Sequence, residues 1–272
     1  CHSLPRKNNH IVDFSSIKRL LDKDGLRENI QKKTAKQLEQ KKIHTQKTVQ
    51  SFDIPGEEDF WGLVSQLWLV KNAEILKWDF QKPDYGIEVF FNHFLKEVGK
   101  TGIRFNILLG NSKIVTHFAL PANHNEYLFI LSIPFIRALD LSKLEIALLL
   151  YEDIFRSDLG LFKKFVLDDE VRKFIGSNFY KKKYPKNVLN NIMNKYDKFI
   201  LEKGFDFNQQ FRITKLVDTS LHKTSKYRNA YRSMIKKKVS LVKSNPSFSR
   251  YPQIYPSPEL QINWLVLQDD NS

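Results

Sequence analysis

Residues 142–155 predict one buried helix, and this helix constrains the fold more than any other segment. Ser142 and Glu145 form an S-x-x-E capping box, in which the serine hydroxyl accepts from backbone N–H groups of the first helical turn. Apolar residues then recur at helical spacing and form one stripe, made of Leu144, Ala147, Leu148, Tyr151 and Phe155. We therefore expect this helix to lie at the centre of the fold, with apolar residues on most of its sides.

Three short strands are predicted before this helix, at 104–109, 114–119 and 127–131. Turn residues separate them at 110–111 and 122–125. The other periodic segments predict helices, and only 10 glycines argue against an all-β fold. We predict an α+β fold, mainly helical with a sheet of about three strands. Its other helices are expected at 57–77, 85–98, 160–175, 186–203, 207–222 and 225–243, followed by a Pro-rich segment at 245–258 and a short helix through Trp264.

The order of these segments resembles a known family. The stretch Thr116–Pro121, the strand Tyr127–Leu131 and the helix ending in Tyr151–Phe155 resemble the HtpX-like gluzincin metallopeptidases, which include outer-membrane lipoproteins. The segment Tyr255–Ile262 resembles the element that closes these domains, with Gln261 where arginine is usual. The resemblance implies a zincin-like domain over about 60–265.

The resemblance also implies that the zinc ligands are missing. The two histidine positions of HExxH fall on Tyr151 and Phe155, and only Glu152 remains. The best match to the third ligand, a glutamate, is Gln210. Phenylalanine has no lone pair, and a neutral phenol or amide is a poor ligand for zinc. We therefore expect no metal, no cofactor and no catalytic residue.

The same reasoning predicts where these side chains lie. Glu152, without a metal-bound water to deprotonate, is expected to pair with a neighbouring Lys or Arg. Tyr151 and Phe155 are expected to be buried and to fill the space where the family holds zinc.

An active hydrolase with replacement ligands is the second hypothesis. His117, His124, Glu152 and Asp153 are the available donors, and at least three of them would have to reach one ion.

The sole cysteine, Cys1, predicts a lipid anchor. An N-terminal cysteine is what remains when a bacterial lipoprotein is processed, and it then carries acyl chains. We therefore divide the chain into a lipid-anchored tether at 1–11, a polar helical or flexible extension at 12–55 and a metallopeptidase-like domain at 56–272. This places the protein in the bacterial envelope, anchored to the outer membrane and facing the periplasm.

A formal net charge of +14 predicts a polyanionic partner. Nucleic acid is not expected in the periplasm, so an acidic protein face or anionic lipid is favoured, and docking on anionic lipid or lipopolysaccharide is the third hypothesis. The favoured function is a non-catalytic binding or assembly subunit of an envelope protein complex. An extended partner peptide could add to the strand near 127–131, at an edge formed by Tyr127, Phe129 and Leu131.

Overall fold

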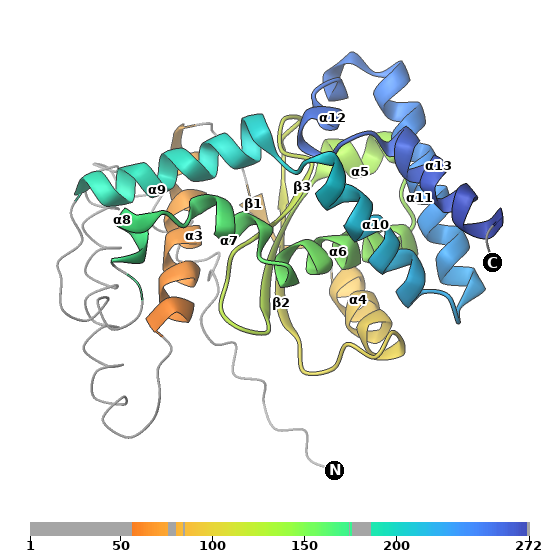
Figure 1. Ribbon diagram of the computed structural model, residues 1–272, viewed down its shortest axis with the longest axis horizontal. Coiled ribbons are helices and arrows are strands. Elements are labelled where there is room, and N and C mark those ends of the chain that lie inside the picture. The colour runs from red at the N-terminus through yellow and green to blue at the C-terminus, as the bar shows by residue number, and fades with distance from the viewer. Residues whose placement is uncertain (1–55, 76–79, 84, 174, 176–185, 271–272) are drawn as a thin grey trace, which may run out of the picture.

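The computed structural model describes residues 56–270, except 76–79, 84, 174 and 176–185 (Figure 1). The predictions for Cys1, for the tether at 1–11 and for the extension at 12–55 lie outside the described residues. The described part is mainly helical and contains one small mixed sheet. This confirms the predicted α+β class.

The sheet has four strands in the order β1-β2-β4-β3. Strands β2 (Arg104–Gly110) and β4 (Glu126–Ser132) run parallel to each other. At the two edges, β3 (His117–Leu120) is antiparallel to β4, and β1 (Phe80–Gln81) is antiparallel to β2. The three predicted strands are therefore present, and the two-residue β1 is an addition that no sequence pattern signalled.

The peptide-binding edge predicted on β4 is wrong, because β4 is an inner strand. β2 pairs along one side of it and β3 along the other, so no backbone edge is left for an added peptide. All seven residues of β4 are buried, as expected for a strand covered on both faces. The predicted edge residues, Tyr127, Phe129 and Leu131, are core residues of this strand.

The strand at this edge of the sheet is β3. The Ser132 N–H donates to the Thr116 carbonyl at 2.8 Å, which fixes the alternation of hydrogen bonds along β3. His117 and Ala119 therefore direct their backbone groups away from β4. The Tyr255 hydroxyl donates to the outward-facing His117 carbonyl, so that part of the edge is already covered.

Helix α6 (Lys143–Asp158) lies at the centre of the fold, as predicted. Its capping box is complete, with the Glu145 N–H donating to the Ser142 hydroxyl at 3.2 Å and the Ser142 N–H donating to the Glu145 carboxylate at 3.1 Å. The helix is buried on almost every side because it packs against β3, β4, α4 (Tyr85–Glu97), α10 (Phe207–Ser220) and α11 (Ser225–Ser244). Polar residues at 152, 153 and 156 are therefore in the core as well.

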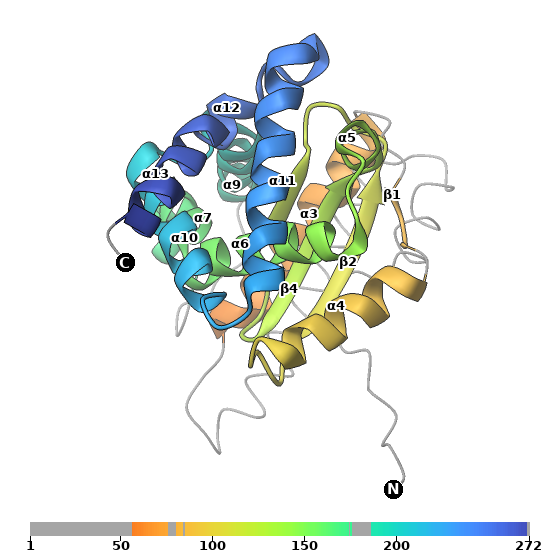
Figure 2. The same ribbon diagram turned by 90° about the vertical axis from the view of Figure 1, so that its right-hand side faces the viewer.

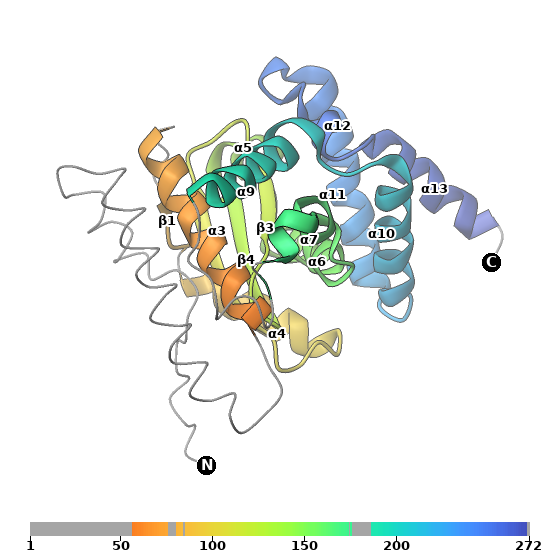
Figure 3. The ribbon, with the colours of Figure 1, turned by 60° about the vertical axis from the view of Figure 1, so that its left-hand side comes forward.

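The remaining helices cover the sheet from both sides. Helices α3 (Gly56–Ile75) and α9 (Lys186–Lys198) lie on one side, and α6 lies with α10, α11 and α13 (Pro258–Asp270) on the other (Figures 1 and 3). Figure 2 shows α11 crossing in front of α6. Shorter elements connect these helices: α5 (Ile133–Leu139), α7 (Leu161–Val166), α8 (Asp169–Arg172), the π-helical turn η2 (Phe199–Lys203), the 3-10 turn η3 (Pro246–Phe248) and α12 (Tyr251–Ile254).

Four segments differ from the predicted helices, since the Pro-rich segment contains η3 and α12, and the last helix continues past Trp264 to Asp270. The helix expected at 160–175 is divided, because Leu167 is extended and Asp168 caps a new helix by accepting from the Val171 N–H at 2.8 Å. Helix α5 was not predicted, because its apolar residues follow β4 without a turn. Ser132 nevertheless caps α5 by accepting from the Phe135 N–H.

Gly204→Ala should strongly destabilise the protein. Gly204 has a φ of +59°, and an added Cβ would lie 2.2 Å from the Ile254 carbonyl oxygen, so the α12 backbone would have to move. Gly160→Ala is the control, because Gly160 has a φ of +63° but nothing within 4 Å of an added Cβ. Thermal and urea unfolding should give a loss of about 1 kcal/mol for the control and about 3 kcal/mol or more for Gly204→Ala. Equal losses would show that the contact with Ile254 is not restrictive.

Candidate buried charge site

A cluster of charged and aromatic side chains lies beside the second half of α6. Three of its members, Glu152, Asp153 and Arg156, come from α6, where positions i, i+1 and i+4 share one side. We call this group the Arg156 cluster. The other members, which come from β3, α10, α11, α12 and the residue after α12, are His117, Gln210, Tyr231, Lys238, Tyr251 and Tyr255, and every member is buried.

The guanidinium of Arg156 is at the centre of the cluster. It donates to Asp153 Oδ1 at 2.6 Å, to Gln210 Oε1 at 2.8 Å and to the Glu152 carboxylate. The side chain is 3% exposed, so these oxygens replace the water that the cation would otherwise bind. Burial alone would lower the pKa of Arg156, but the two carboxylates outweigh it and raise the pKa above its usual value. Arg156 is therefore a permanently charged core residue.

Glu152 is held as a carboxylate. It accepts from the Tyr231 hydroxyl at 2.6 Å on Oε2, and Gln210 Nε2 lies 3.4 Å from Oε1. Burial would raise the pKa of Glu152, but Arg156, Lys238 and the Tyr231 hydrogen bond outweigh burial and lower the pKa to about 2. The predicted pairing of Glu152 with a neighbouring basic residue is confirmed, and the partner is Arg156.

His117 links β3 to this cluster. Its Nδ1 lies 2.9 Å from Asp153 Oδ2, and its Nε2 lies 3.0 Å from the Tyr251 hydroxyl. A carboxylate can only accept, so Nδ1 carries the proton and the neutral ring accepts from Tyr251 through Nε2. Burial lowers the pKa of His117 below 6.5, against the opposing effect of Asp153. The ring is stacked on Tyr255 with a centroid distance of 4.1 Å.

Lys238 brings a second cation into the core from α11. Its ammonium has no hydrogen-bond partner among the described residues and lies 5.7 Å from the centroid of the Tyr251 ring. Burial lowers the pKa of Lys238, and the Glu152 carboxylate opposes that shift. The cluster therefore contains two carboxylates, one permanent cation and one lysine. Burial disfavours the charged form of that lysine.

The predicted positions of Tyr151 and Phe155 are only partly correct. Tyr151 is buried, but Phe155 is half-buried. Both rings face α4 and the loop after it. Tyr151 packs edge-on against Phe94 at 5.4 Å, and Lys100 Nζ lies 4.8 Å from the Phe155 centroid. Neither ring contacts the Gln210 side chain, whose partners on α6 are Glu152 and Arg156.

The positions that converge with Gln210 are 152 and 156, one residue further along α6. Arg156 and Glu152 both contact the Gln210 side chain, so these three residues meet at one point. Gln261 Nε2 also donates to Thr214 Oγ1 at 2.9 Å, and Thr214 is hydrogen-bonded to Gln210. This arrangement does not fit zinc, because a guanidinium has no lone pair to donate and its charge repels a cation.

The proposed replacement ligands do not come together either. His117 and Asp153 are adjacent in the buried cluster, whereas His124 lies exposed in the turn between β3 and β4 and lines a surface pocket. Among the described residues, no group of three or more His, Cys, Asp or Glu side chains could hold a metal ion.

Sequence reasoning missed Arg156, Tyr231, Lys238, Tyr251 and Tyr255. Arg156 carried a usable signal, since a basic residue four positions after Glu152 lies on the same side of a helix. The other four are 79 to 103 residues further along the chain than Glu152, and no local pattern linked them to it.

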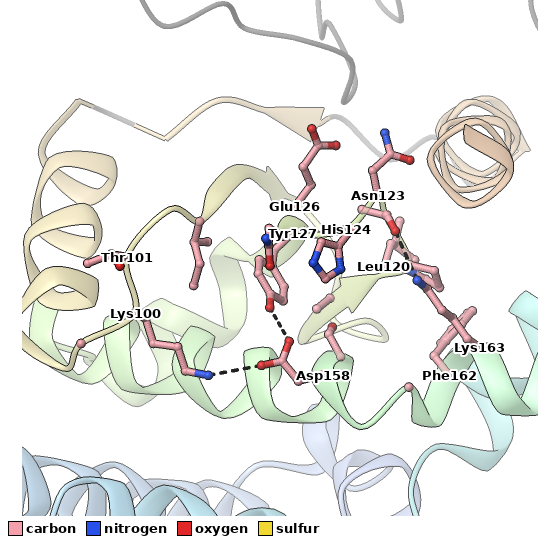
Figure 4. A pocket seen from close by; sticks show the side chains of 18 residues that line it. Lys100, Thr101, Leu120, Asn123, His124, Glu126, Tyr127, Asp158, Phe162 and Lys163 are labelled. Atoms are coloured by element: carbon pink, nitrogen blue, oxygen red, sulfur yellow. Dashed lines mark hydrogen bonds and ion pairs between the residues drawn. The ribbon is translucent and has the colours of Figure 1, made fainter. Parts of the chain in front are cut away.

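The surface pocket has a volume of about 620 Å³ and lies at the end of β3 (Figure 4). Ala119 and the following turn line one part of it, and Lys100, Asp158 and Lys163 line another. The Tyr127 hydroxyl donates to Asp158, whose other oxygen lies 3.3 Å from Lys100 Nζ. The pocket therefore joins outward-facing backbone to charged side chains, and its volume is in the range of ligand sites.

The chain was compared with protein-family models and with curated proteins, and it matches neither any family model nor any curated protein. In the part of the chain that the structure describes, no helix is long and apolar enough to cross a membrane.

The stability of the folded chain should fall with pH below 6.5 because of His117. The pKa of His117 is lower in the folded state, so the unfolded chain binds one more proton in this range, and the free energy of unfolding decreases as pH falls. Between pH 7 and pH 5.5 this amounts to about 1 kcal/mol. Urea titrations at both pH values should show a smaller decrease for His117→Gln than for the wild type.

The control for this measurement is His124→Gln, because His124 is exposed and outside the cluster. It should keep the wild-type pH dependence. An unchanged slope in His117→Gln would mean that the folded protein accepts a proton on His117. Glu152 acts in a separate window, since its folded-state pKa of about 2 contributes stability that is lost between about pH 4.5 and pH 2.

Proposed function

We propose that this protein is a non-catalytic, metallopeptidase-like subunit that binds or assembles proteins in a bacterial envelope complex. The observation that carries the proposal is the meeting of Glu152, Arg156 and Gln210 at one point. The resemblance gives positions 151, 155 and 210 for the zinc ligands, whereas 152 and 156, one residue further along α6, are the positions that meet 210, so the proposal requires a shift of one residue in that match. The cation at this point is the Arg156 guanidinium.

Burial of the site argues against hydrolysis. Glu152, Asp153 and His117 could act as acids or bases in an open cleft, but each is at most 1% exposed and bound to a partner within the core. Only about 10 Å³ remains between Arg156, Phe205 and Tyr255, which is too little for a substrate. The active-hydrolase hypothesis is therefore not favoured.

The surface pocket beside β3 is the proposed binding site. The backbone N–H and C=O groups of Ala119 point away from β4, and Ala119 lines the pocket. An extended polypeptide could therefore form hydrogen bonds with the Ala119 backbone there. Lys163 lies on the pocket wall and favours acidic groups in the partner, whereas the Lys100 ammonium on the same wall is paired with Asp158.

A rebuilt zinc site tests the metallopeptidase-like scaffold. The triple variant Glu152→His, Arg156→His, Gln210→Glu should bind zinc, because these positions converge, and zinc should raise its melting temperature. The matched control, Tyr151→His, Phe155→His, Gln210→Glu, should not bind zinc, because Tyr151 and Phe155 face α4. Elemental analysis and thermal unfolding with and without zinc measure both effects.

Two results would count against the scaffold. Zinc binding by the control and not by the first variant would mean that the ligand positions have been wrongly assigned. Stoichiometric zinc in the wild-type protein, lost in Glu152→Gln, would overturn the non-catalytic proposal even if neither triple variant folds.

The pocket variant Thr101→Glu, His124→Glu tests the binding role. Both side chains are exposed and line the pocket, so the charges should repel an acidic partner without destabilising the fold. Affinity capture from envelope membranes at about 0.15 M salt, where exposed charges still interact over about 8 Å, should recover a partner with the wild type and at least about tenfold less with this variant. Lys96→Glu, exposed on α4 and outside the pocket, is the control. Equal recovery with all three proteins would exclude the pocket.

A further inference from the structure

One nitrogen of the Arg156 guanidinium is buried without a hydrogen-bond partner. The two terminal nitrogens donate to oxygens of Glu152, Asp153 and Gln210. Arg156 Nε, in contrast, is bonded to no group of the described residues. A buried N–H group without an acceptor is rare in folded proteins, because it has lost its hydrogen bond to water and gained none in exchange. The side chains of the Arg156 cluster therefore leave one donor to be satisfied by another group.

A small cavity lies beside this side chain. Its volume is about 10 Å³, which is close to the space that a single water molecule needs. Arg156 lines the cavity together with Asp153, Ser157 and Tyr255, and Ala119 and phenylalanine rings form the rest of the wall. Cavities that stay empty in proteins are lined by apolar groups alone, so a polar lining of this kind indicates a hydrated site.

The polar groups of the cavity have hydrogen-bonding capacity left. Asp153 Oδ1 accepts from Arg156 at 2.6 Å, and Oδ2 accepts from His117 at 2.9 Å, but each carboxylate oxygen can accept a second bond. The Tyr255 hydroxyl donates to the His117 carbonyl, so its oxygen can still accept. Ser157 follows Asp153 by four residues and lies on the same side of α6. Together with Arg156 Nε, these groups supply the two to four partners that a buried water requires.

We infer that this cavity binds one water molecule, which accepts from Arg156 Nε and donates to the Asp153 carboxylate. An organic ligand is excluded by the volume. The guanidinium repels a metal cation, and the carboxylate repels a small anion. The inference does not depend on the proposed binding subunit, because it requires no protein partner.

The cavity adjoins the surface pocket beside β3. Ala119, Ser157 and Phe162 line both spaces, so these three residues form the wall between them. The bound water therefore lies between the surface pocket and the pair of Asp153 and His117 in the core.

A high-resolution crystal structure of the full chain tests the inference directly. It should show an ordered water oxygen within about 3.2 Å of Arg156 Nε and of an Asp153 oxygen. In solution, the proton on Arg156 Nε should give a cross-peak to water in a rotating-frame Overhauser spectrum, with the sign of a dipolar contact and not of chemical exchange. Absence of water density from the cavity, or an Nε–H group that donates to a protein oxygen, would overturn the inference.

Two matched variants locate the water. His117 and Ala119 lie on one face of β3, so the Ala119 methyl group points toward α6 as the His117 ring does. Ala119→Val enlarges the side chain there and should expel the water, with loss of both the density and the cross-peak. Ala138→Val makes the same change at an exposed position on α5 and should keep both.

The variants also provide a second way to reject the inference. Water that stays bonded to Arg156 Nε in Ala119→Val would lie outside this cavity and would overturn the assignment. If Ala119→Val does not fold, the wild-type density and cross-peak decide the question without it.

Discussion

The interaction on which the core depends is the set of bonds around the Arg156 guanidinium. A cation that is 3% exposed is very costly unless oxygen atoms replace its water, and this requirement fixes the neighbours of α6. Gln210 brings α10 to the site, and Tyr231 brings α11 through the Glu152 carboxylate. His117 and Tyr251 bring β3 and α12 through Asp153. One charge therefore determines how five elements pack.

A buried charge cluster of this kind determines which helices and strands pack together more than it increases the net free energy of unfolding. An apolar set of the same volume could be as stable, because desolvating each ion offsets much of the attraction between them. Removal of a single partner is different, since it leaves an opposite charge buried without compensation. The Arg156 cluster accordingly holds two carboxylates against Arg156 and Lys238, and burial lowers the pKa of Lys238 despite the opposing Glu152 carboxylate.

The sequence predicted the elements well and the site only in part. The capping box, the three strands and the central helix were predicted because each depends on a pattern within a short stretch of sequence. Residues 152 and 156, rather than 151 and 155, contact Gln210, and the sequence did not show this because α6 is buried on nearly every side. The apolar stripe through Tyr151 and Phe155 then suggested a single inward face, although the opposite side of the helix, with Glu152 and Arg156, was also in the core. The tyrosines and Lys238 come from distant segments that no periodicity connects to α6.

Helix α10 contacts the charged core with one face and lies at the surface with the other. Gln210 points inward and completes the charge cluster, while its neighbour Phe211 points outward and meets Trp264 at the surface. Gln210 is fully buried and therefore cannot contact a ligand, so its role is to stabilise the fold. The outer ring is 40% exposed, so it leaves much of its apolar area in water. Ile213 and Val217 supply the apolar core face of α10, whereas Phe207 and Phe211 lie exposed on its outer face.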